Sequence, residues 1–206
     1  MVKLFSLVVV VLLSSLGALG QRPAALETFA SPDGAFRFVY PENYELLVGE
    51  RILKATQGRH AGIPVCDFST ALVCVIYPIE GQENSRLEAA GFSIDAVQGV
   101  TAEPDCLAYA DRFERPHGEE SQPSPFRMNG VLFRYASARR MTTDHAQYSD
   151  LYLTFQKERC YELRIAISLA GDLNAQQPSS SRSLEAARAD RARESLKLIL
   201  SSVIFR

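Results

Sequence analysis

Three segments in the second half of the chain alternate apolar and polar side chains, and this alternation constrains the fold more than any other feature. The segments are 131–135, 151–155 and 161–167. A period of two places successive side chains on opposite faces of a β-strand. About ten to fifteen residues and no clear helix separate the first two segments, so we expect an antiparallel meander.

The first half of the chain adds shorter strands. Phe36, Phe38 and Tyr40 recur at period two in a segment that ends at Pro41. A second strand edge is expected over 46–48. The β-branched run 72–77, stopped by Pro78, is typical of a strand that is covered on both faces.

Helix formers fill 83–90, and Gly91 follows them. This composition predicts a short helix that closes at the glycine. A strand is predicted over 92–96, although a continued helical stripe is the alternative. Segment 21–30 is expected to be loose, and the proline-rich segment 115–125 is expected to be an exposed loop.

The chain ends in a predicted amphipathic helix. A polar stretch, 176–181, precedes it, Ser183 can cap it, and Glu185 lies in its first turn, where a negative charge suits the helix dipole. Five residues at spacings of three and four form a stripe that should lie on the sheet: Ala189, Ala192, Leu196, Ile199 and Val203. The opposite face carries four basic residues: Arg188, Arg191, Arg193 and Lys197. We expect them to be solvated; contact with an acidic partner or an anionic membrane surface is the alternative.

The N-terminus has the form of a secretory signal peptide. Lys3 precedes an apolar run over 4–19, which ends in the small residues around Gly20. Retention as a membrane anchor is the alternative, but spanning needs roughly 20 apolar residues. We therefore expect a leader over 1–20 and a mature domain over 21–206. That domain should be single, secreted or periplasmic, and without a membrane span.

The chain has four cysteines: Cys66, Cys74, Cys106 and Cys160. An even number in an exported chain predicts disulfides. Three pairings are open; Cys66 with Cys74 is the most attractive because it closes a tight loop, and it leaves Cys106 with Cys160. The spacings match neither zinc sites nor redox dithiols.

No motif for catalysis, metal or cofactor is visible. The formal net charge of −2 gives no basic footprint for nucleic acid. His60, His117 and His145 have no metal-ligand spacing. Asp144 beside His145 is the one acid–imidazole neighbour pair, and Glu119-Glu120 is a candidate pair of carboxylates. We expect no catalytic, cofactor-binding or metal-binding residues, and no cofactor.

Both ends of the expected domain resemble those of PsbP-like domains. Segment 29–44 has an aromatic strand that ends in Tyr40-Pro41 with Tyr44 shortly after, and the last helix runs into 200–205. The resemblance implies an α+β fold, an antiparallel sheet with helices on both sides in a PsbP-like α/β/α sandwich. It also implies an accessory or assembly factor that binds other proteins, or an exported protein without an assigned role. The family has no common set of catalytic residues that could be carried over to this sequence.

Two function classes follow. The first is an exported, disulfide-stabilised, non-catalytic binding or assembly-accessory domain that uses a sheet edge or the 115–125 segment against a protein partner. The second is a secreted hydrolase whose site assembles from dispersed residues around Asp144 and His145, or Glu119. The absence of any local motif favours the first.

Overall fold

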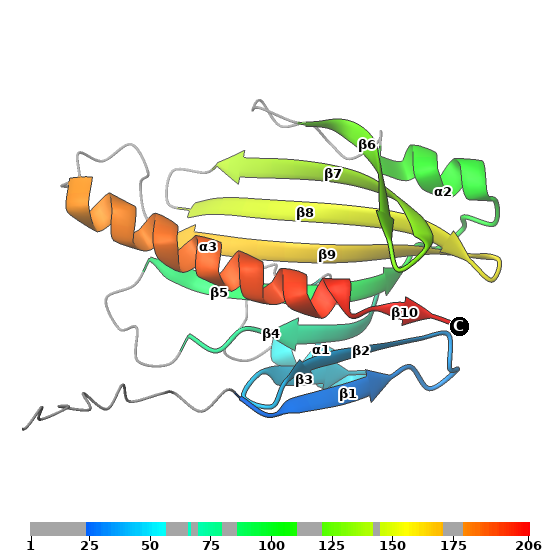
Figure 1. Cartoon of the computed structure of the whole chain (residues 1–206), viewed down its shortest axis with the longest axis horizontal. Coiled ribbons are helices and arrows are strands. Elements are labelled where there is room, and N and C mark those ends of the chain that lie inside the picture. Colours follow the sequence, from blue (N-terminus) through cyan, green and yellow to red (C-terminus); the bar gives the residue numbers. More distant parts are fainter. Residues whose placement is uncertain are drawn as a thin grey trace, which may run out of the picture.

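The computed structural model describes residues 24–56, 66, 70–79, 86–110, 121–141, 145–170 and 179–206 (Figure 1). Within them lie a seven-stranded sheet of order β3-β4-β5-β9-β8-β7-β6 and a three-stranded sheet of order β1-β2-β10, both antiparallel. The predicted leader, 1–20, lies outside the described residues. The α+β class expected from the sequence is confirmed.

The larger sheet is formed by β3 (Glu45–Val48), β4 (Ala71–Ile76), β5 (Leu87–Ala96), β6 (Ser121–Met128), β7 (Val131–Met141), β8 (His145–Gln156) and β9 (Arg159–Ala170). The smaller sheet is formed by β1 (Leu26–Ala30), β2 (Phe36–Pro41) and β10 (Ile204–Phe205). The helices are α1 (Glu50–Thr56), α2 (Glu103–Tyr109) and α3 (Ser179–Ser201).

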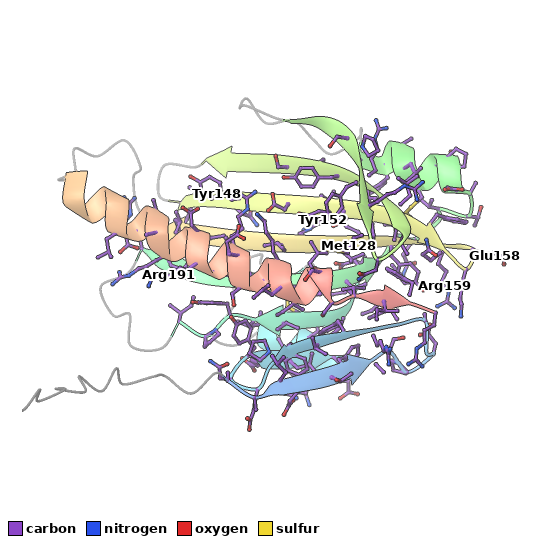
Figure 2. All side chains as sticks on the ribbon, in the orientation of Figure 1. Met128, Tyr148, Tyr152, Glu158, Arg159 and Arg191 are labelled. Carbon is purple, nitrogen blue, oxygen red and sulfur yellow. A yellow bond between two sulfur atoms is a disulfide. The ribbon has the colours of Figure 1, made fainter. Side chains whose placement is uncertain are left out.

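The predicted meander is confirmed as β7, β8 and β9, which pair in chain order. The strands are longer than the alternating segments, because β8 and β9 stay in register over their whole length up to Gln156 and Arg159. Lys157 and Glu158 form the turn between them with positive φ angles of 48° and 62°, as hairpin turns of the primed types require. Figure 2 labels Glu158 and Arg159 at this end of the sheet. The guanidinium of Arg159 donates a hydrogen bond to the carboxylate of Asp33 at 2.9 Å.

Helix α3 and the small sheet cover one face of the large sheet. The apolar stripe of α3 is buried as predicted, with Ala192, Leu196 and Ile199 at 0–1% exposure. Phe36 and Phe38 of β2 are equally buried, and Phe38 packs edge-on against Phe92 of β5 at 5.7 Å. Aromatic side chains therefore join the two sheets on the α3 side.

The short helices α1 and α2 cover the opposite face. Ile52 of α1 packs with Cys74, Ile76 and Ala166, and Cys106 of α2 packs with Leu151 and Leu153. These strand residues alternate with those that face α3, so the sheet is buried from both sides. The expected arrangement of a sheet between helices is confirmed.

The helix predicted over 83–90 is wrong where the structure describes it. Leu87, Ala89 and Ala90 belong to β5, where they are at most 2% exposed and pair with β9. Helix propensity is a weak preference that burial and strand pairing override. The strand predicted over 92–96 is the second half of β5, as expected.

Three boundaries also differ from expectation. Segment 21–30, predicted to be loose, contains β1, and residues 121–125 of the predicted loop belong to β6. Helix α3 begins at Ser179, before the expected cap at Ser183. The short helices α1 and α2 were not predicted, because one or two turns carry too little periodicity to be detected.

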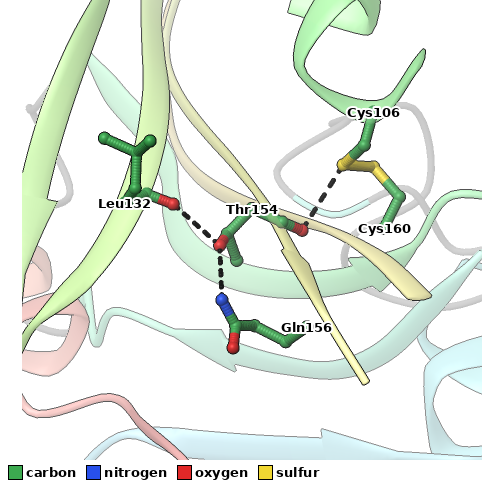
Figure 3. The surroundings of a disulfide bond; sticks show 5 residues. All are labelled: Cys106, Leu132, Thr154, Gln156 and Cys160. Carbon is green, nitrogen blue, oxygen red and sulfur yellow. Dashed lines mark hydrogen bonds between the residues drawn. A yellow bond between two sulfur atoms is a disulfide. The ribbon is translucent and has the colours of Figure 1, made fainter. Parts of the chain in front are cut away.

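Both predicted disulfides are present, Cys66–Cys74 and Cys106–Cys160. All four cysteines are at most 1% exposed. The second disulfide ties α2 to the start of β9, and the Sγ atom of Cys106 lies 3.4 Å from the carbonyl oxygen of Thr154 (Figure 3). The Thr154 hydroxyl donates to the carbonyl of Leu132 at 2.9 Å, so α2, β8 and β7 are joined around one buried threonine.

The two disulfides are expected to differ in their contribution to stability. They close loops with sequence separations of 8 and 54 residues. A disulfide stabilises the fold because it lowers the chain entropy of the unfolded state. From these loop lengths, Cys66–Cys74 should contribute about 2.5 kcal/mol to the free energy of unfolding and Cys106–Cys160 about 4 kcal/mol. Chemical denaturation of the two double Cys→Ala variants should show this order. Because the cysteines are equally buried, the loss of packing is matched, and a reversed order would contradict the account.

Candidate functional site

Of the acid–imidazole candidates, the structure describes only His145. Its Nδ1 atom lies 2.9 Å from Oε2 of Glu88, and the Ser168 hydroxyl donates to that same carboxylate oxygen at 3.3 Å. In a serine nucleophile site the hydroxyl would instead donate to the imidazole. These contacts therefore do not form a serine–histidine pair. Asp144, Glu119, Glu120, His60 and His117 lie outside the described residues.

A buried carboxyl pair lies on the face of the sheet that α1 and α2 cover. Asp95 and Glu162 are directly opposite each other on β5 and β9 and are 3% and 4% exposed. Arg164 bonds Glu162, whereas Asp95 accepts hydrogen bonds from Ser93 at 2.8 Å and Thr70 at 3.1 Å. Burial, opposed by these hydrogen bonds, raises the pKa of Asp95 to about 7.

The rest of this face offers no metal centre in the described part of the chain: no group of three or more His, Cys, Asp or Glu side chains is placed to hold an ion. Within the same residues, no helix is both long enough and apolar enough to cross a membrane. The oxygens of Asp95 and Glu162 instead accept hydrogen bonds from neighbouring side chains, Ser93 and Thr70 on Asp95 and Arg164 on Glu162.

The α3 face carries a different cluster, which we call the aromatic strip: Phe126, Met128, Tyr135, Tyr148 and Tyr152. The ring of Tyr152 lies 5.0 Å from that of Tyr135 and 5.6 Å from that of Phe126. Phe126 is 40% exposed, and Tyr135, Tyr148 and Met128 are half-buried. Figure 2 shows Tyr148, Tyr152 and Met128 beside α3, on the side toward β7.

Strand register explains how these rings meet. Phe126 is opposite Phe133 on the β6–β7 pair, and Tyr135 is opposite Tyr152 on the β7–β8 pair. Directly opposed residues share a face of the sheet. Since Phe133 is a core residue on the α3 side, the whole strip faces α3.

An ion pair fixes α3 beside the strip. Both Nε and Nη2 of Arg193 donate to the carboxylate of Asp150, which is 2% exposed, and the Tyr135 hydroxyl donates to it at 3.1 Å. The hydrogen bonds to Asp150 raise the pKa of Arg193 above its usual value. Burial, with the nearby Asp150 charge, raises the pKa of Tyr152 and of Tyr135. Tyr135 and Tyr152 are therefore neutral hydroxyl groups at any physiological pH.

The tip of the β6–β7 hairpin closes the strip at its other end. Asn129 and Gly130 form the turn with φ angles of 50° and 80°, the sequence that a type I′ turn favours. The Asn129 amide donates to the carbonyls of Ser201 and Val203 at 2.9 and 2.8 Å. The strip is thus held between α3 and a hairpin that is anchored to the end of α3.

Comparison with known proteins gives similarity at the level of fold. No protein-family model matches the chain, and no curated protein matches it. Similar solved structures include a crystal structure from Bacteroides thetaiotaomicron, with 10% identity and a TM-score of 0.45 over 90% of this chain and 49% of that one. This chain therefore spans about half the length of that structure.

Two further similar structures have names. Cyanobacterial PsbP from Synechocystis has 13% identity and a TM-score of 0.45 over 94% of this chain and 99% of that one. LpqN of Mycobacterium tuberculosis, which is involved in cell envelope biogenesis, has 9% identity and a TM-score of 0.44 over 89% and 86%.

Sequence reasoning missed the strip and the carboxyl pair. Arg193 was assigned to a solvated helix face, and its partner Asp150 precedes the alternating segment 151–155. One signal was available, the tyrosines at positions 148 and 152. If the predicted strand 151–155 had been extended toward the N-terminus, both side chains would have been expected on the same face of the sheet.

Asp95 makes a prediction about pH. The folded protein keeps its proton up to about pH 7, whereas the usual carboxyl pKa of 3.8 releases it in the unfolded chain. Stability should therefore fall as pH rises from 4 to 7, by up to about 4 kcal/mol. Asp95→Asn should abolish this component in denaturation series across that range.

A matched control has the opposite sign. The Ser31 hydroxyl holds the pKa of the exposed Asp33 carboxyl below its usual value. The Asp33 carboxylate therefore stabilises the folded protein near neutral pH, and this stabilisation is lost in acid. Asp33→Asn should remove it. If Asp95→Asn left the pH dependence of unfolding unchanged, the assignment of the proton to Asp95 would fail.

The Asp150–Arg193 pair makes a prediction about stability. Arg193→Ala leaves a buried carboxylate without its cation, which should lower the free energy of unfolding by about 2–3 kcal/mol. Lys197→Ala breaks the more exposed pair with Glu194 on the same helix, for which a loss of less than about 1 kcal/mol is expected. The free energies of unfolding are measured by thermal and urea denaturation. If Arg193→Ala and Lys197→Ala lowered them equally, burial of the Asp150 carboxylate would not depend on its ion pair with Arg193.

Proposed function

We propose that this chain is an exported, non-catalytic binding domain that holds a protein partner on the aromatic strip. Residues 1–20 act as a cleaved leader, and 21–206 form one secreted or periplasmic domain. The pairing of all four cysteines supports export, because disulfides persist in oxidising compartments and are rare in the cytosol.

The partly exposed aromatic strip is the observation that carries the proposal. Tyrosine, phenylalanine, methionine and arginine are the residues enriched at the centres of protein interfaces. Phe126 is exposed although it belongs to a row of rings in contact, and Tyr135 is only half-buried. A partner side chain that covers Phe126 would complete the burial of this row.

The strip is also rigid in a way that favours binding. Its tyrosines come from the paired strands β7 and β8, and α3 is fixed beside them by the bonds between Arg193 and Asp150. Side chains already held in place lose little conformational entropy when a partner arrives. We propose a protein rather than a nucleic acid as the partner, since the formal net charge is −2.

The alternative hydrolase centred on Asp144 and His145 has no supporting contact among the described residues. The hydroxyl of Ser168 and the imidazole of His145 both bond Glu88, rather than each other. Asp95, whose pKa is near neutral, is 3% exposed, so a substrate atom could not reach it without displacing core side chains.

Photo-crosslinking tests the proposal in the cells that make the protein. A photoreactive phenylalanine analogue in place of Phe126 should give one defined protein adduct. The control places the same analogue at Leu198, which is 71% exposed on α3 outside the strip, and should not give that adduct. Phe126→Ala should then reduce capture of the identified partner by about tenfold or more.

Two results would contradict the proposal. One is the absence of an adduct at Phe126 under conditions in which the exported protein is abundant. The other is the same set of adducts from Phe126 and Leu198, which would show that the strip is no more a binding surface than any other exposed apolar position.

A further inference from the structure

Strand β1 has an outer edge with which no described strand pairs, and the hydrogen bonds define what that edge presents. The N–H of Glu42 donates to the carbonyl of Ala25 at 2.8 Å. In an antiparallel ladder bonded and non-bonded pairs alternate, so Glu27 and Phe29 point their backbone groups toward β2. The backbone groups of Leu26, Thr28 and Ala30 therefore point outward.

Strand β2 provides an independent check on this alternation. Val39 is opposite Thr28, and its N–H donates to the hydroxyl of Ser202 at 2.9 Å on the side away from β1. Val39 and Thr28 are therefore a non-bonded pair. The N–H and carbonyl of Thr28 face outward, at the centre of the five-residue strand.

The other described sheet edges are protected against strand addition. The edge strand β6 contains Pro123 and Pro125, which have no N–H to donate. Strand β10 has two residues, and β3 has four before Gly49 and α1 follow. Strand β1 has neither proline nor lysine, the residues that commonly block an exposed edge.

We propose that β1 pairs antiparallel with β1 of a second copy of this chain, about a two-fold axis through Thr28. This surface is separate from the aromatic strip. The axis places Thr28 opposite Thr28 of the second copy and Leu26 opposite its Ala30, and each of these pairs exchanges both N–H···O bonds. The two small sheets then form one continuous sheet.

The side chains of β1 are compatible with this symmetry. Glu27 is set opposite Phe29 of the second copy, so no like charges face each other directly. Tyr40 donates a hydrogen bond to Glu27 and holds it on the inner face. On the outer face, Leu26 is 68% exposed and would be covered by the second copy. A self-complementary strand of this kind favours a second copy over an unrelated peptide.

Thr28→Pro is the decisive variant. It removes an outward N–H and leaves the bonds between β1 and β2 intact. Sedimentation equilibrium of the protein, purified after expression with its own N-terminal segment, should show a reversible dimer for the wild type. Thr28→Pro should weaken dimerisation by about 30-fold or more, because the symmetric pair loses two hydrogen bonds at once. Thr28→Val keeps the N–H and should dimerise like the wild type.

A second pair of variants guards against misfolding of Thr28→Pro. Leu26→Glu adds charge to an exposed position of β1 and should also weaken the dimer, whereas Leu198→Glu on α3, likewise an exposed leucine, should not. A wild-type protein that stays monomeric over the accessible concentration range would overturn the proposal. So would a dimer that both β1 variants leave unchanged.

Discussion

Strand β9 must be buried on both faces, and the rest of the structure follows from that requirement. It pairs with β5 along one edge and with β8 along the other, and nine of its twelve residues are buried. A strand in this position needs cover from two layers. Helix α3 and the aromatic residues of the small sheet supply one layer. The helices α1 and α2, each next to a disulfide, supply the other.

The two layers are held by different means, and this difference bears on function. On the α1 and α2 side, two disulfides hold the covering layer, and Asp95 and Glu162 are buried beneath it. On the α3 side a long helix covers only part of the sheet width. The bonds between Arg193 and Asp150 fix its position, and the tyrosines of β7 and β8 remain half-buried beside it. The proposed protein-binding surface rests on this combination of a fixed helix and partly covered aromatic rings.

Much of the architecture could be predicted because the signal was local. The alternation of β7, β8 and β9, the stripe of α3 and the even number of cysteines each report on their own segment. The helix predicted over 83–90 failed because the burial of Leu87 and Ala90 depends on β9, which is distant in sequence. The same reason explains the missed site: Asp150 and Arg193, like Asp95 and Glu162, become neighbours only through the register of the sheet or the docking of α3.

The central claim is that this is an exported domain held together by two disulfides, and intact mass measures it most directly. The protein should be isolated after expression with its own N-terminal segment and alkylated before and after reduction. The account predicts a mass that begins near Gln21 and four alkyl groups that are added only after reduction, since all four cysteines are paired. A retained leader, or alkylation without reduction, would contradict it.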